Sequence, residues 1–173
     1  MCALFRKWLK RKSGTTAIEF SMLLIPYMML ALGIIELSVM FTAANLLEGA
    51  TGTAARLIRT GQLQQSGGDP ATQFRAALCQ ATSALIDCND VVIEVKVLSS
   101  FSDYAGPTYD ADGNMVSSGF DAGGSGDKIL VRTSYRYNMI TPLVGPLLSG
   151  GTGSRVFIST IVMETEPYEF QGA

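Results

Sequence analysis

A carboxylate at the edge of an apolar run is the residue of this sequence with the clearest chemical use. Glu19 directly precedes residues 20–40, which are almost wholly apolar. An ionisable group at a bilayer costs a few kcal/mol, so we expect a charge kept there to have a use. A cation close to Glu19 would recover part of that cost. The alternative is a charge at the level of the lipid headgroups with no partner.

Two cysteines could form a cross-link. Cys79 and Cys88 lie nine positions apart in the downstream part of the chain, whereas Cys2 lies near the start. If the downstream part is exported, both thiols reach an oxidising compartment and can pair. Closing a loop of that size would stabilise the fold by roughly 2.5 kcal/mol. The alternative is two unpaired buried thiols.

Residues suited to catalysis are scarce. The chain has no histidine, which excludes Ser-His-Asp and Cys-His sites and most zinc sites. An EF-hand-like frame runs from Asp110 to Asp121, but Met115 replaces its turn glycine and Asp121 replaces its bidentate glutamate. A solvated, turn-rich loop fits these residues better. We therefore expect no enzyme activity, no catalytic residue, no metal site and no cofactor.

The charges are unevenly distributed along the chain. The formal net charge is −2, yet residues 1–14 carry five basic and no acidic side chains, which leaves residues 15–173 at −7. An acidic body without a basic patch argues against nucleic-acid binding. The basic head fits the cytoplasmic side of a membrane, where Lys and Arg accumulate.

The element that must position Glu19 is a long apolar helix. A hydrocarbon core of about 30 Å needs about 20 helical residues, which places its far boundary near Met40. Glu36 lies about 25 Å beyond Glu19 along such a helix, so we expect it near the outer headgroups, either snorkelling or contacting another molecule. An ordinary signal anchor is the alternative. Beyond the bilayer, an amphipathic half should pack on a folded domain through Leu46, Leu47, Ala50, Ala54, Leu57 and Ile58.

The rest of the chain predicts a small α+β domain. A second helix should begin at Asp69-Pro70, because aspartate caps helices and proline suits the first turn, and end near Asp87. Alternating β-branched residues predict strands at 91–98, 128–139 and 156–164. Three or four antiparallel strands would pack on the long helix. Between the strands lie a polar loop at 99–127, either functional or mobile, and an apolar loop at 140–153.

The junction between the basic head and the apolar run resembles a known signal. Ser13-Gly14-Thr15-Thr16-Ala17-Ile18-Glu19-Phe20 is similar to the class III signal peptide of type IV pilins, and Gly33-Ile34-Ile35-Glu36-Leu37 resembles a stretch common in TadE-like proteins. Over residues 1 to about 55, the chain therefore resembles the TadE-like minor pilins, or pseudopilins, of Tad (type IVb) pilus systems.

This resemblance implies three parts and two roles. Residues 1–14 would be a cleaved basic leader, 15–66 a long helix with a transmembrane first half, and 67–173 an exported α+β domain. A prepilin peptidase would cut between Gly14 and Thr15 on the cytoplasmic side. Glu19 would then neutralise the Thr15 amine of a neighbouring subunit.

The same resemblance implies a location, partners and a function. The protein would cross the bacterial inner membrane once, with its N-terminus cytoplasmic and its C-terminal domain periplasmic, and could enter an extracellular pilus. Its partners would be the prepilin peptidase, other major and minor pilins, and the inner-membrane assembly platform. Its size suggests a minor subunit that serves initiation, the tip or assembly of an adhesive pilus. The alternative is an uncleaved, single-pass binding module of the cell envelope.

Overall fold

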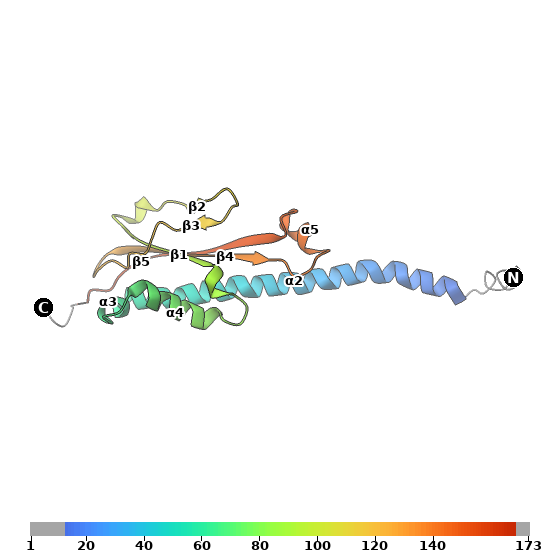
Figure 1. Cartoon of the computed structure of the whole chain (residues 1–173), viewed down its shortest axis with the longest axis horizontal. Coiled ribbons are helices and arrows are strands. Elements are labelled where there is room, and N and C mark those ends of the chain that lie inside the picture. Colours follow the sequence, from blue (N-terminus) through green and yellow to red (C-terminus); the bar gives the residue numbers. More distant parts are fainter. Residues whose placement is uncertain (1–12, 169–173) are drawn as a thin grey trace, which may run out of the picture.

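The structure is a computed structural model that describes residues 13–168, with side chains from residue 16 onward. It is an α+β protein in which one long helix carries a small sheet domain on its C-terminal half (Figure 1). The other half of the helix extends away from the domain (Figure 1). The predicted fold class is therefore confirmed.

The long helix α2 spans Ser13–Arg59, 47 residues, and continues through Pro26. It ends earlier than the expected boundary at residue 66, because Gly61 adopts a left-handed conformation with φ of 72°. A Cβ atom at Gly61 would lie 2.6 Å from the Tyr168 ring, so this position requires glycine. A separate short helix, α3, follows at Gln62–Gln65.

The second helix, α4, spans Pro70–Thr82 and begins where the sequence predicts. The Asp69 carboxylate caps it by accepting a hydrogen bond from the Thr72 backbone amide at 2.9 Å. The predicted end near Asp87 is wrong. The Thr82 carbonyl accepts hydrogen bonds from the amides of both Leu85 and Ile86, which turns the chain and buries Ile86 at 4% exposure.

Three antiparallel strands form the main sheet in the order β1-β4-β5: β1 at Val91–Leu98, β4 at Lys128–Asn138 and β5 at Ser154–Glu164. All three strands were predicted, with bounds that agree to within two residues. One face of the sheet packs on α2, as the alternating pattern indicates. The shared core includes Ala43, Leu47, Ala50, Ala54, Ile58, Phe74, Leu78, Val91, Val95, Ile129, Val131 and Tyr137.

The polar insert at 99–127 covers the other face of the sheet (Figure 1). It contains the short helix η2 at Phe101–Asp103 and a hairpin of β2, Thr108–Tyr109, with β3, Met115–Val116. An isolated bridge between Val95 and Phe120 attaches its return segment to the outer edge of β1. The insert is thus a third layer of the domain.

The segment between β4 and β5 is more regular than the expected loop. It forms a short helix, α5, at Gly145–Ser149, closed by Gly150 in the left-handed conformation. This helix lies at the end of the sheet that is nearer to the extended half of α2 (Figure 1).

Candidate functional site

The residues of the predicted processing and pairing site lie in the first turns of α2. Gly14 and Thr15 have helical backbones, and Glu19 follows one turn later. The basic head falls in residues 1–12, outside the described residues. The Glu19 side chain is exposed, and it forms no hydrogen bond or ion pair with the residues that the structure describes.

Large apolar side chains surround the extended half of α2 on all sides. Their exposed fractions range from 37% at Met29 to 73% at Met22. Soluble surfaces rarely expose so large a continuous apolar area. The helix is long and apolar enough to cross a membrane. The exposed set between residues 18 and 35 is Ile18, Phe20, Met22, Leu23, Ile25, Tyr27, Met28, Met29, Leu30, Leu32, Ile34 and Ile35.

Glu36 is the first described residue of α2 that the folded domain buries, at 1% exposure. Its carboxylate accepts three hydrogen bonds from the same chain: from the Tyr137 hydroxyl at 3.1 Å, the Ile140 amide at 3.0 Å and the Thr141 amide at 2.8 Å. This contradicts the expectation that Glu36 snorkels to the headgroups or contacts another molecule. A buried carboxylate is tolerated because donors surround it.

The partners of Glu36 lie more than one hundred residues downstream, so no local pattern could reveal them. The available signal is chemical: a carboxylate inside an apolar run needs donors. The contact with Glu36 also affects the pKa of Tyr137. Burial, together with the hydrogen bond to Glu36 and its negative charge, raises the pKa of the Tyr137 hydroxyl to about 12.

A buried ion pair joins two strands beneath the insert, and the sequence did not reveal it. Glu94 and Arg132 are register partners on β1 and β4, with 2.7 Å between Glu94 Oε2 and Arg132 Nη1. Arg132 also donates to the Ala105 carbonyl at 2.7 Å, and the Ser118 hydroxyl donates to Glu94 at 2.5 Å. The pair therefore fixes both arms of the insert to the sheet.

The electrostatics of this pair favour the charged carboxylate. Burial raises the pKa of Glu94, but the hydrogen bond from Ser118 and the positive charge of Arg132 outweigh it, so the net pKa lies below the ordinary 4.5. A lone charge in each of two strands is a weak sequence signal, because the register that pairs them is a tertiary property.

The acidic frame of the insert closes a turn. The Asp110 carboxylate accepts hydrogen bonds from the backbone amides of Asp112 and Asn114, at 2.9 and 2.8 Å, and from the Asn114 side chain at 3.0 Å. Arg136 of β4 donates to the Asn114 side chain at 2.5 Å, which holds the hairpin over the sheet. Within residues 13–168, no three His, Cys, Asp or Glu side chains gather where a metal ion could bind.

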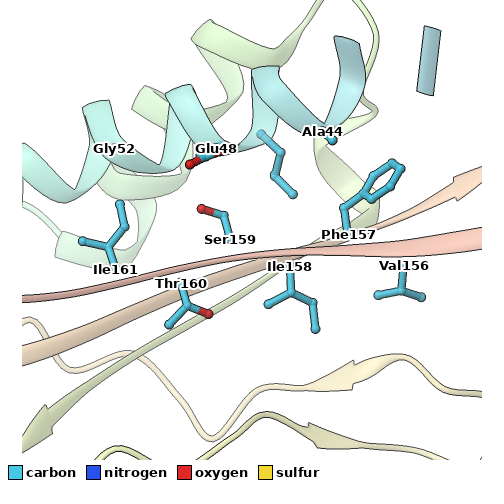
Figure 2. Close-up of a pocket in the computed structure, with 10 residues that line it drawn as sticks. Ala44, Glu48, Gly52, Val156, Phe157, Ile158, Ser159, Thr160 and Ile161 are labelled. Carbon is cyan, nitrogen blue, oxygen red and sulfur yellow. The ribbon is translucent and has the colours of Figure 1, made fainter. Parts of the chain in front are cut away.

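A groove of about 660 Å³ separates α2 from the edge strand β5 (Figure 2). Figure 2 shows Phe157, Ser159 and Ile161 pointing toward the helix, whereas the alternate residues of the strand point away. The helix side of the groove carries Ala44, Leu47, Glu48 and Gly52. Ala44 and Gly52 are small, which leaves this space open. The strand β5 is an outer strand of the main sheet.

A disulfide joins Cys79 of α4 to Cys88, with 5.5 Å between their Cα atoms. Cys88 begins a short 3-10 helix, Cys88–Asp90, that leads into β1. The Arg75 side chain crosses the same connection and donates to the Cys88 carbonyl at 3.0 Å. The pairing expected for an exported domain is thus the one that the structure contains.

Comparison with known protein families gives a match that lies within α2. Residues 14–56 match the family model described as TadE-like protein. Over this segment the chain is similar to TadE-like proteins. The match begins at Gly14, includes Glu19 and Glu36, and ends near the end of α2. No curated protein and no solved structure matches the chain.

The TadE-like segment suggests involvement in a Tad pilus system. The match covers about a quarter of the chain. The sheet domain lies beyond residue 56, outside the matched segment.

Proposed function

We propose that this chain is a minor pilin, or pseudopilin, of a Tad (Flp-type) pilus. It would insert in the inner membrane, be processed by a prepilin peptidase, and take part in initiation, the tip or assembly of an adhesive pilus. One observation carries this proposal: the TadE-like helix exposes apolar side chains on all sides and presents the exposed carboxylate of Glu19 one turn after Thr15.

The proposed processing step releases residues 1–14 and leaves Thr15 with a free amine. Glu19 lies four residues later, about 6 Å along the helix, so the amine and the carboxylate sit at nearly the same depth. In a bundle of such helices, the carboxylate of one subunit can pair with the amine of a neighbour. Pairing offsets the cost of both charges in a medium of low dielectric constant.

The proposed topology follows from the charges at the two ends of the span. The basic residues before Gly14 favour the cytoplasm, and the sheet domain, with its disulfide, suits the periplasm. The expected partners are the prepilin peptidase, other major and minor pilins, and the inner-membrane assembly platform. The residues from 67 onward form the exported part in this proposal.

A second candidate function rests on the groove between α2 and β5. An uncleaved, single-pass protein could use this groove and the adjacent outer edge of β5 to hold an extended segment of another envelope protein. In that case, the helix would serve only as an anchor.

The size of the mature chain distinguishes the two proposals. We expect N-terminal sequencing of the membrane-purified protein to begin Thr15-Thr16-Ala17 when the peptidase is active. The variant Gly14→Leu should remain unprocessed, because the peptidase must fit the residue before the cut. A wild-type chain that still starts at residue 1 or 2 would reject the pilin proposal and favour the anchored module.

A further inference from the structure

The segment between β4 and β5 exposes an apolar surface next to the extended half of α2. Ile140, Leu143 and Leu147 are 67%, 69% and 71% exposed. Residues 139–154 contain no Asp, Glu, Lys or Arg. We call residues 140–149, which include α5, the apolar foot.

Contacts with α2 fix the depth of the apolar foot along the helix. Glu36 accepts hydrogen bonds from the Ile140 and Thr141 amides. Val144, a buried residue of the foot, lies against Gly33, since its methyl group would be 3.4 Å from a Cβ atom there. The foot is therefore attached at the level of residues 33–36.

This level falls within the apolar run of the helix. A hydrocarbon core of about 30 Å that starts at Phe20 ends about 20 residues later, near Met40. Glu36 lies about 24 Å from Phe20 at 1.5 Å per residue, so the foot reaches the outer boundary of the span. At the same level the helix exposes Ile34 and Ile35, at 56% and 57%.

Two backbone amides of the foot, those of Ile140 and Thr141, are paired as a lipid boundary requires. These two amides donate hydrogen bonds to the Glu36 carboxylate. Neither the amides nor the carboxylate are therefore left unpaired in a medium of low dielectric constant. Arg155 follows the foot, is exposed, and donates to the Leu148 carbonyl at 2.8 Å. An arginine above apolar side chains is typical of the headgroup region.

We propose that the apolar foot inserts into the outer leaflet of the bilayer as a second membrane contact, with Ile140, Leu143 and Leu147 in the lipid. The helix alone lets the domain rotate and tilt, whereas two contacts fix its height and orientation above the membrane. This proposal rests on α2 crossing a membrane and does not depend on membership of a pilus.

The test places a lipid-sensitive fluorophore at single cysteines of the full chain. In a Cys2→Ser background, with the Cys79–Cys88 disulfide intact, Leu143→Cys and Leu147→Cys are labelled in phosphatidylethanolamine–phosphatidylglycerol vesicles. Ile25→Cys reports on the helix, and Ala76→Cys, exposed on α4, serves as the control outside the bilayer. The quencher is a lipid with a spin label on its acyl chain.

We expect the labels at positions 143 and 147 to be quenched several-fold more strongly than the label at 76, and in the same range as the label at 25. Quenching at position 25 without quenching at 143 and 147 would overturn the proposed insertion of the apolar foot. It would still support a membrane-spanning α2. Lack of quenching at 25 would overturn both. Signals at 143 that depend on the protein-to-lipid ratio and not on the quencher would show that a second copy covers the foot, which also overturns the proposal.

Discussion

The carboxylate of Glu36 accepts a hydrogen bond from the hydroxyl of Tyr137 at 3.1 Å, across 101 positions of sequence. This contact lies where the exposed half of the TadE-like helix meets the sheet domain. It joins α2 to the end of β4. The same carboxylate accepts hydrogen bonds from two backbone amides of the segment after β4, which is thereby joined to α2 as well. The junction is therefore a specified contact and does not depend on apolar packing alone.

Removing one donor from this junction should destabilise the domain. We expect Tyr137→Phe to lower the free energy of unfolding by about 1–3 kcal/mol, because it leaves a buried carboxylate with one partner fewer. Urea unfolding in detergent micelles measures the change. Tyr109→Phe is the matched control, since Tyr109 is 55% exposed. Equal stability of the two variants would mean that the contact contributes nothing.

The buried ion pair should be far more sensitive to substitution than the exposed one. Arg132→Met leaves the Glu94 charge buried without its partner, and we expect a loss of about 3–5 kcal/mol. The same substitution at Arg59, whose ion pair with Glu166 is exposed, should cost about 0–1 kcal/mol. Chemical unfolding of both variants makes the comparison, and similar losses would contradict it.

The low pKa of Glu94 predicts a pH-dependent stability. Because the pKa is lower in the folded state than the ordinary 4.5, ionised Glu94 stabilises the fold above that value. This contribution is lost as the pH falls through the folded pKa. The difference in unfolding free energy between wild type and Glu94→Gln should therefore be largest near neutral pH and shrink below pH 4.5. A constant difference down to strongly acidic pH would refute this assignment.

The disulfide should stabilise the domain without determining its fold. We expect Cys79→Ala with Cys88→Ala to unfold with a free energy lower by roughly 2–3 kcal/mol, since the cross-link restricts the unfolded chain. Cys2→Ser should have no effect on the same measurement. In protein taken from the periplasm, mass spectrometry of a non-reduced digest should show the two peptides linked. Alkylation of both thiols without reduction would rule out the bridge.

Glu19 should act in assembly and leave folding unchanged. It lies on the extended half of α2, away from the core, so Glu19→Ala should retain an inserted, folded and cleaved protein. In the proposed pilus, the variant should lose crosslinking to other pilins and reduce fibre counts, because the neighbour's Thr15 amine would lose its partner. Asp112→Ala, at an exposed position of the insert, is the control at matched expression. Normal fibres in the Glu19→Ala variant would mean that Glu19 is only an interfacial charge.

The sequence predicts those elements whose cause is local. Asp69-Pro70 specifies the start of α4, since the cap and the first turn need only neighbouring residues. The alternation in residues 91–98 specifies β1, and the apolar stripe of the outer helix is the stripe that packs on the sheet. These patterns depend on the period of a helix or a strand and on little else.

Features that depend on the tertiary fold were not predictable in this way. The early end of α2 is an exception, because a glycine in the left-handed conformation, here Gly61, is a local signal that was missed. The partners of Glu36 and the pairing of Glu94 with Arg132 depend on strand register and chain reversal. The insert appeared as a polar loop because the sequence does not show which surface it covers.

The alignment of α2 with the strands has a mechanical consequence. The helix and the main sheet run along the same axis (Figure 1). Tension applied to the extended half of α2 would load its contacts with the sheet in shear, so many contacts share the force and do not open one after another. The contacts at residues 33–36 lie at the end of the interface where this force enters. The Cys79–Cys88 link joins α4 to the start of β1, to one side of the helix, and would carry little of the load.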